Sequence, residues 1–281
     1  MEHGPRALAK ALHARAAIGR LPKAVLVVHL YGQCADMEPI LEVCRRHGVA
    51  VVEDAAEAVG AVYKGKAAGT LGDVGVYSFN GNKIITTTSG GMLMSHNAAW
   101  VEKARFWSQQ SREPALWYEH SELGYNYRMS NVLAGIGRGQ LEVVDARVQQ
   151  RRAIAFRYRD AFADLQGIRL MPQASYGLHT NWLSCFLINE QEFGCSRDQL
   201  IRMLDMAGVE SRPVWKPMHL QPLYSHCERY GGEVAADLFR RGICLPSSSS
   251  LTIDDQTHVI DQVRQASGAA PLPGMNARVS S

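Results

Sequence analysis

The chain has 281 residues, of which 46% are hydrophobic and 20% charged, a globular composition with length for one large or two small domains. Its formal charge of +3 is small and its basic and acidic residues are interleaved, which excludes a nucleic-acid partner. No apolar run is long enough to cross a bilayer or to form the core of a signal peptide. We therefore expect a cytoplasmic protein with no membrane partner.

The first half of the chain alternates apolar runs with amphipathic segments. Residues 7–17 predict a helix, and the apolar run 24–28 predicts a buried strand. A second helix is predicted over 36–47, ending at Gly48, and a second strand over 49–52. Strand, helix and strand within about thirty residues form a βαβ unit, so we expect a parallel sheet flanked by helices.

Further elements follow along the chain. The pattern predicts a strand over 74–78 and a helix over 98–110, and then one long helix over 129–164 that connects two domains. Beyond it, the sequence predicts a smaller α+β domain from a strand over 182–188, a helix over 196–207 with Ser196 as its N-cap, and a helix over 233–241.

These elements divide the chain into a large domain over 1–140, a connecting helix over 141–165, a small domain over 166–266 and a disordered tail over 267–281, which is rich in Ala, Pro, Gly and Ser. Six cysteines are scattered without a C-x-x-C pair or a histidine at zinc-finger spacing. That pattern favours reduced, mostly buried thiols, and we expect no metal in the functional site.

Two segments carry candidate chemistry. The strand that ends at Val52 delivers Glu53 and Asp54 to its carboxyl end, where open parallel sheets bind ligands; the alternative is a cap for a following helix. Lys83 stands between a strand end and a Gly/Ser/Thr-rich turn, and its neighbour Ile84 limits its hydration. Partial desolvation leaves an amine nucleophilic. Taken alone, a lysine in this position is more often an ordinary solvated lysine.

The segment Gly60 to Ala67 falls one residue short of the nucleotide-binding loop G-x-x-x-x-G-K-[ST]. Ala67 has no hydroxyl with which to ligate magnesium. Residues 61–63 followed by Lys64 and Gly65 are more typical of a strand and a tight turn than of a loop that opens a helix. An NTPase is therefore disfavoured.

The ordered motifs V-V-E-D-A-A-E (51–57), S-F-N-G-N-K (78–83) and T-T-T-S-G-G-M (86–92) resemble those of the DegT/DnrJ-type nucleotide-sugar aminotransferases, which are fold-type I enzymes that depend on pyridoxal 5′-phosphate (PLP). The resemblance runs from about residue 23 to about residue 265 and includes V-H-L-Y-G-Q, G-Y-N-Y-R-M and R-P-V-W-K-P-M-H. It implies an α/β fold with a mostly parallel sheet flanked by helices, and a smaller C-terminal α+β domain.

The resemblance also implies roles for single residues. Lys83 would form the Schiff base with PLP and move the proton during catalysis. Asp54 would pair with the protonated pyridine nitrogen, and Ser78 would donate its hydroxyl to the phosphate. Glu57 stands where many relatives carry Gln beside the phenolic oxygen, a departure that brings two negative groups together. Asn126 would reach the cofactor of the other subunit of a homodimer. Taken alone, Ser78 is equally a strand-end hydroxyl, and Asn126 is equally a turn residue.

On the substrate side, the resemblance implies that Arg212 and His219 meet a donor carboxylate or the diphosphate of a nucleotide sugar, although a surface arginine and a packed histidine are common. The donor implied is glutamate. The acceptor implied is a nucleotide-linked 4-keto-6-deoxy sugar, more narrowly a UDP-linked 4-keto-6-deoxy-N-acetylhexosamine, for surface glycans. Two alternatives stay open: a sugar dehydratase, which would carry His in place of Lys83, and a non-catalytic remnant that binds only a partner subunit or a nucleotide sugar.

Family members carry a segment ahead of the point where the resemblance begins. It supplies a phosphate-binding turn and an aromatic residue that stacks on the pyridine ring, and residues 1–22 do not resemble it. We therefore expect a truncated cofactor-binding domain with weakened cofactor retention, since each charge-assisted hydrogen bond contributes about 1.5–3 kcal/mol. We also expect an exposed apolar sheet surface.

Overall fold

The computed structural model describes residues 3–271 and divides the chain into two compact units. One unit, termed here the sheet unit, contains residues 8–148 and 174–180; of the described residues, the other, the C-terminal unit, contains 3–7, 149–173 and 181–271. The predicted domain boundaries stay a prediction. Within residues 3–271, no helix combines the length and the apolar character that crossing a membrane requires.

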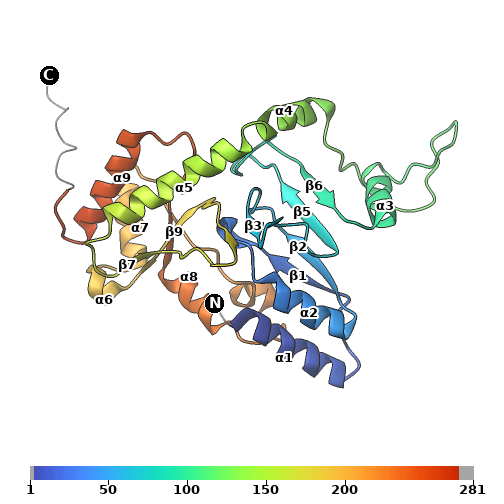
Figure 1. The fold of residues 1–281 in the computed structure, drawn as a ribbon, viewed down its shortest axis with the longest axis horizontal. Coiled ribbons are helices and arrows are strands. Elements are labelled where there is room, and N and C mark those ends of the chain that lie inside the picture. The colour runs from blue at the N-terminus through green and yellow to red at the C-terminus, as the bar shows by residue number, and fades with distance from the viewer. Residues whose placement is uncertain (1–2, 272–281) are drawn as a thin grey trace. The chain divides into compact units, whose positions relative to one another are not determined.

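A four-stranded sheet forms the centre of the sheet unit (Figure 1). Its order is β1-β2-β5-β6; the first three strands run parallel, and β5 pairs with β6 antiparallel. The strands are β1 (Ala24–Val28), β2 (Ala50–Asp54), β5 (Val74–Ser78) and β6 (Gly91–Met94). The mostly parallel sheet flanked by helices that the sequence predicts is therefore confirmed.

Two helices cover one face of this sheet, α1 (His3–Ala17) and α2 (Met37–His47). Helix α2 ends at Gly48, which adopts the left-handed conformation (φ 65°) that favours glycine, as the sequence predicts. Apolar side chains of both helices join inward-facing residues of β1 and β2 in one core, among them Leu12, Met37, Ile40, Cys44, Val27 and Val51. This core packs against the face of the sheet on which the Glu53 side chain lies.

The opposite face of the sheet carries exposed apolar side chains. Leu26 and Val28 of β1 are 62% and 43% exposed, and Leu93 of β6 is 40% exposed. The register pairs Val28 with Asp54 and Leu93 with Val76, so all of these side chains share one face. The apolar sheet surface expected from the sequence is therefore present.

A second small sheet begins with the hairpin β3 (Val62–Tyr63) and β4 (Lys66–Ala67), and β8 (Gly177–Leu178) pairs with β3. Lys64 and Gly65 have φ angles of 46° and 83°, as a two-residue hairpin turn requires. The strand and tight turn predicted for this segment are confirmed, and no helix follows that would serve a phosphate-binding loop.

The single helix predicted over 129–164 is wrong, because the segment forms two helices. Helix α4 (Asn131–Leu141) and helix α5 (Val144–Ala161) are separated at Glu142 and Val143. Three glycines at alternate positions of α4 lower its helix propensity just before the break. Helix α3 (Ala98–Ser108) matches its prediction to within two residues.

The C-terminal unit contains an antiparallel sheet of order β10-β11-β9-β7. Its strands are β7 (Ile168–Leu170), β9 (Ser184–Ile188), β10 (Arg212–Pro213) and β11 (Gly242–Leu245). In addition to α5, this unit contains the helices α6 (Glu190–Phe193), α7 (Arg197–Met206), α8 (Glu233–Arg241) and α9 (Ile253–Ala266). Short 3-10 turns complete the described elements: η1 (Leu30–Gly32), η2 (Met218–Leu220) and η3 (Pro222–Tyr224).

Helix α7 begins with a complete capping box between Ser196 and Gln199, so the predicted N-cap is confirmed. Tyr158, Phe162 and Phe186 form the aromatic centre of the core, with ring centroids 5.5–6.3 Å apart. The predicted disordered tail falls mostly on residues 272–281, which lie outside the described residues.

Candidate functional site

Asp54 and Ser78 lie on the same face of the central sheet, at the carboxyl ends of neighbouring parallel strands. The register pairs Asp54 of β2 with Val76 of β5, and Ser78 is two residues beyond Val76. Because side chains alternate along a strand, Val76 and Ser78 point to the same side as Asp54. Polar groups from two strands therefore meet at the edge where parallel sheets bind ligands.

Local hydrogen bonds fix the backbone around Asp54. Its carbonyl accepts the N–H of His29 at 3.0 Å, and its Oδ1 accepts the N–H of Ala56 at 3.1 Å. The segment that follows forms turns, and no helix begins there. The alternative that this acidic pair caps a helix is therefore wrong. Asp54 is half-buried, and its turn bond uses Oδ1 and not Oδ2.

Lys83 lies in the loop between β5 and β6, which is closed at its base by main-chain bonds. Phe79 N–H donates to Gly90 O at 3.0 Å, and Phe79 O accepts the N–H of Thr87 at 2.9 Å. The two residues after Lys83, Ile84 and Ile85, are 5% and 3% exposed. These buried side chains anchor the loop directly after Lys83, which is half-buried.

The far side of this loop packs closely on neighbouring segments. Gly90 has φ 99°, and a Cβ atom built on it would lie 2.7 Å from Met129 Cε. A Cβ on Gly137 of α4 would lie 2.9 Å from Thr87 Cγ2. Glycine at these two positions therefore allows the Lys83 loop to sit against α4 and the residues before it, which restricts where Lys83 can move.

Glu57 contacts the turn after β1. Its Oε2 accepts the N–H of Tyr31 at 2.8 Å, and Tyr31 has φ 59°, a conformation that a non-glycine residue rarely adopts. The carboxylate thus stabilises the turn Leu30–Gly32. The predicted place of Glu57 beside the cofactor stays a prediction. The structure adds that its carboxylate already accepts one main-chain N–H, that of Tyr31.

Asn126 is exposed between two aromatic residues. The rings of Tyr125 and Tyr127 stack with centroids 4.9 Å apart, and Asn126 forms a bridge with Gln109 at the end of α3. Beside it opens a cavity of about 690 Å³ whose lining includes Met92, Leu93, Arg105, Trp107, Tyr125 and Arg128. Asn126 is therefore an exposed residue between two stacked tyrosines, beside this cavity.

Arg212 and His219 belong to the C-terminal unit. Arg212 of β10 is exposed, and its Nε and Nη2 donate to Glu210 Oε1 at 3.0 and 2.7 Å. His219 packs against Gly232, where an added Cβ would lie 2.8 Å from the imidazole Cε1. The Arg212 guanidinium is thus held by a neighbouring carboxylate in an exposed pair, an interaction that water and salt weaken.

Glu53, for which no role was predicted, forms a buried cluster of hydrogen bonds on the inner face of this sheet. Its two carboxylate oxygens accept the N–H groups of Gly69, Leu71 and Gly72 at 2.6–2.8 Å. The His29 ring lies 2.8 Å away through Nε2. Glu53 and His29 are both fully buried. The signal for Glu53 in the sequence is an acidic residue one position before Asp54, on the inward side of an alternating strand.

Hydrogen bonding determines the charge state of this cluster. Burial alone raises the pKa of Glu53, but the bonds from His29 and from the three main-chain N–H groups outweigh it and lower the pKa below its ordinary value. His29 Nδ1 accepts the N–H of Ala35 at 3.1 Å, so Nε2 carries the proton that is donated to Glu53.

Cys34 completes a group of three potential metal ligands with His29 and Glu53. However, the Nε2 atom that would bind a metal is protonated, and every Glu53 oxygen is already an acceptor. Burial, followed by the nearby Glu53 charge, raises the pKa of Cys34 to about 12, so the thiolate that metals bind is strongly disfavoured. This cluster is a hydrogen-bonded support for the sheet.

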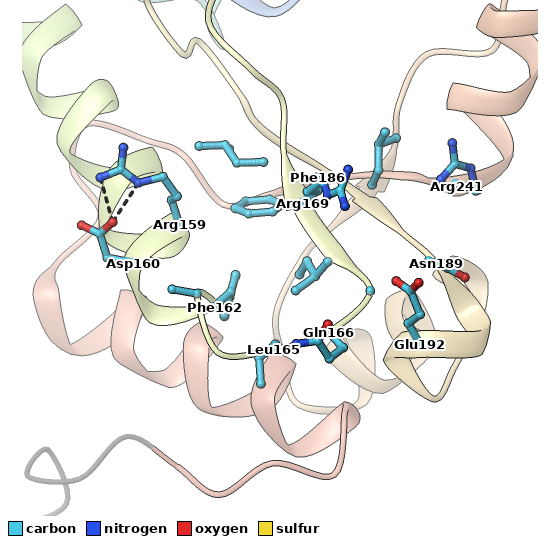
Figure 2. A pocket seen from close by; sticks show the side chains of 15 residues that line it. Arg159, Asp160, Phe162, Leu165, Gln166, Arg169, Phe186, Asn189, Glu192 and Arg241 are labelled. Carbon is cyan, nitrogen blue, oxygen red and sulfur yellow. Dashed lines mark hydrogen bonds and ion pairs between the residues drawn. The ribbon is translucent and has the colours of Figure 1, made fainter.

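A cavity of about 650 Å³ in the C-terminal unit is lined in part by the edge strand β7 (Figure 2). None of the predicted site residues lines it. Arg159 and Asp160, which Figure 2 shows on one side of the cavity, form an ion pair with each other. Its charged groups are therefore partly neutralised, and the candidate chemistry lies elsewhere.

Comparison with known proteins identifies the class to which this fold and this set of residues belong. The sequence model of the DegT/DnrJ/EryC1/StrS aminotransferase family matches residues 5–264. EpsN of Bacillus subtilis (strain 168), named as a pyridoxal phosphate-dependent aminotransferase, is 50% identical over 261 residues, 92% of this chain and 66% of EpsN. GDP-perosamine synthase of Caulobacter vibrioides is 42% identical over 244 residues, 86% of this chain and 66% of that protein.

Solved structures agree with this assignment. The crystal structure of a DegT DnrJ EryC1 StrS aminotransferase from Brucella abortus superposes with a TM-score of 0.84 at 26% identity, covering 94% of this chain and 70% of that one. The chain belongs to the DegT/DnrJ/EryC1/StrS aminotransferase family. It spans about two thirds, 66%, of the length of the two curated relatives named above.

Pyridoxal phosphate is the cofactor of this family, and the described residues fit it in type. Ser78 Oγ accepts the N–H of Asn80 at 3.3 Å, which leaves its own O–H available as a donor to a phosphate. Asp54 presents a carboxylate on the same face, as a protonated pyridine nitrogen requires. The amine of Lys83 comes from the loop that follows Ser78 directly.

Proposed function

We propose that this chain carries the catalytic residues of a PLP-dependent aminotransferase that moves an amino group from an amino acid, glutamate, to a nucleotide-linked 4-keto-6-deoxy sugar. The observation that carries the proposal is the placement of Asp54 and Ser78 on one face of the sheet, with Lys83 in the anchored loop after Ser78. Membership of the aminotransferase family supports the reaction class.

Each residue has a physical task in this proposal. Pyridoxal phosphate, when bound, supplies an electron sink that allows the Cα–H bond of the donor to break. Asp54 holds the proton on the pyridine nitrogen by pairing with it. Ser78 donates its hydroxyl to the phosphate, and Lys83 Nζ holds the cofactor covalently and then moves the proton released from Cα. Glu57, whose carboxylate accepts the N–H of Tyr31, would lie beside the phenolic oxygen of the ring.

The proposed partner is a second copy of the chain, with Asn126 reaching the cofactor site of that copy. The segment from 116 to 132, which contains Asn126, carries many exposed apolar side chains, among them Leu116, Trp117, Tyr118, Leu123, Tyr127 and Val132. Leu116 is 99% exposed. Apolar patches of this kind mark protein–protein interfaces, and size-exclusion chromatography with light scattering tests the dimer.

For the acceptor, we propose a UDP-linked 4-keto-6-deoxy-N-acetylhexosamine destined for surface glycans, processed in the cytoplasm. The name of GDP-perosamine synthase, a relative at 42% identity, makes a GDP-linked keto-sugar the principal competitor. Incubation of the chain with glutamate, PLP and UDP-, GDP- and dTDP-linked keto-sugars, read by mass spectrometry, separates them. Conversion of C=O to CH–NH₂ supports transamination, and loss of water supports a dehydratase.

The first test of the proposal is a covalent bond between Lys83 and the cofactor. Added PLP should give the visible absorbance of a lysine-linked cofactor, and borohydride reduction should leave a phosphopyridoxyl group on Lys83 in peptide maps. The Lys83→Ala variant should lose both signals, whereas Lys66→Ala, at an exposed lysine of β4, should keep them. A folded wild-type chain with no lysine-linked cofactor would instead favour the non-catalytic remnant, for which the exposed Leu26 and Val28 face offers a binding surface.

A further inference from the structure

Two cysteines of the C-terminal unit face each other across neighbouring strands. Cys185 of β9 and Cys244 of β11 are register partners, and their sulfur atoms are 3.6 Å apart. Both are reduced, and they are only 4% and 5% exposed. Because directly opposed residues of antiparallel strands place their side chains on the same face, the two thiols meet within the sheet and need no change of strand register.

The hydrogen-bond pattern indicates which kind of strand pair they form. Cys185 O accepts the N–H of Met171, on the β7 side of the strand, at 2.8 Å. The main-chain groups of Cys185 therefore point toward β7, and Cys185 and Cys244 form a non-hydrogen-bonded pair. Such pairs have Cα atoms about 4.5 Å apart, which falls within the range of about 4.4–6.8 Å that a disulfide spans.

From this geometry, we propose that Cys185 and Cys244 are a site of reversible oxidation to an intramolecular disulfide. The oxidant is a two-electron acceptor such as hydrogen peroxide. Two S–H bonds and the O–O bond break, one S–S bond forms between Cys185 and Cys244, and two water molecules leave. A dithiol reductant reverses the step by thiol–disulfide exchange.

The position of this pair gives the oxidation a consequence. Arg212 of β10 is the register partner of Cys244, so Cys185, Cys244 and Arg212 form one row across three strands. A disulfide in that row joins β9 to β11 beside the strand that carries Arg212. An effect on substrate affinity rests on the proposed role of Arg212, whereas formation of the disulfide does not.

The experiment uses the full chain with Cys195→Ala and Cys227→Ala, which removes the two thiols that are not fully buried. The protein is treated with hydrogen peroxide in its native state, denatured, alkylated and mapped without reduction. We expect two fewer alkylated cysteines than in the untreated protein, a peptide that links Cys185 to Cys244, and recovery of both thiols with dithiothreitol. Cys34, whose sulfur contacts His29 Nε2 at 3.7 Å, is the internal control and should stay alkylatable.

Adding Cys185→Ala should abolish the linked peptide and leave Cys244 alkylatable, with circular dichroism verifying the fold. Should that variant unfold, Cys244→Ala is the second test of the same link. Full alkylation of Cys185 and Cys244 after peroxide treatment of folded protein would overturn the proposal. Equal oxidation of Cys34 and Cys44 would do so as well, because it would show non-specific chemistry.

Discussion

Glu53 and Asp54 are consecutive residues of β2 whose carboxylates lie on opposite faces of the same sheet. Glu53 is fully buried and accepts hydrogen bonds from the loop at Gly69 to Gly72 and from His29. Asp54 is half-buried and shares its face with Ser78. The alternation of the strand thus gives two identical functional groups different tasks: one supports the fold and one faces the candidate cofactor site.

Glu53→Gln should therefore destabilise the protein strongly. The amide keeps the shape of the side chain but places an NH₂ group where His29 or the main-chain N–H groups need an acceptor. We expect the free energy of unfolding to fall by about 3 kcal/mol, because buried donors lose a charged partner. Urea unfolding followed by circular dichroism measures it.

The matched control is Asp54→Asn, in which Oδ1 can still accept the N–H of Ala56. Its stability should change by less than about 0.5 kcal/mol, while its retention of PLP falls, since a neutral amide does not hold a proton on the pyridine nitrogen. Equal losses of stability in the two variants would contradict the division of tasks.

The same carboxylate should make stability depend on pH. The pKa of Glu53 in the folded protein is lowered, whereas in the unfolded chain it is about 4.3. The contribution of Glu53 to the free energy of unfolding is thus complete above about pH 4.3. It is lost as the pH falls through the lower pKa of the folded state, because the unfolded state binds the proton more readily. Thermal unfolding of the wild type between pH 3 and pH 7 should show this loss. The slope should be smaller in Glu53→Gln; an unchanged slope would assign the acid sensitivity to other groups.

The Lys83 loop allows a comparison of two glycines. Gly90→Ala adds a Cβ in a left-handed backbone, 2.7 Å from Met129 Cε, so we expect a loss of about 1–3 kcal/mol and weaker PLP incorporation. Gly81→Ala lies in the same loop with nothing within 4 Å of the added Cβ. Its unfolding free energy should change by less than about 0.5 kcal/mol. If Gly90→Ala binds PLP as the wild type does, the loop does not need this close packing.

Local patterns predicted much of the fold. Strands 24–28 and 74–78 and helix 233–241 have the predicted bounds, because alternation, helical periodicity and end signals are properties of a few consecutive residues. The two-residue strand β10 lacked such a signal, since its pairing with β11 determines it. The break after α4 had a local signal in the three glycines of α4, which the prediction of one long helix did not use. Helix α9 was missed although it has an N-cap at Thr252.

For the candidate site, the sequence supplied residue types and order but few contacts. It placed Asp54 at a strand end, yet the common face of Asp54 and Ser78 depends on the pairing of β2 with β5. The partner of Glu57 is a main-chain N–H in a turn with a positive φ at Tyr31, which no residue pattern indicates. The Cys185–Cys244 contact likewise requires a register between distant strands.

The pair formed by Glu210 and Arg212 leads to a prediction about the donor amino acid. In the free protein, the Arg212 guanidinium is held by Glu210 at 2.7 Å, in a pair exposed to solvent. Glu210→Gln removes the competing carboxylate, so an Arg212 that binds the donor carboxylate should bind it more tightly. An exposed ion pair contributes up to about 1 kcal/mol, and we expect the apparent KM for glutamate to fall by about 2- to 5-fold.

The measurement is the glutamate half-reaction, followed by the change in cofactor absorbance. Asp205→Asn on α7 removes the same charge from another exposed position of the C-terminal unit and should leave KM unchanged. Arg212→Lys should raise KM, because an ammonium group does not form the paired hydrogen bonds that a guanidinium forms with a carboxylate. An identical fall in KM in Glu210→Gln and Asp205→Asn would point to overall charge, and an unchanged KM in Arg212→Lys would remove Arg212 from the donor site.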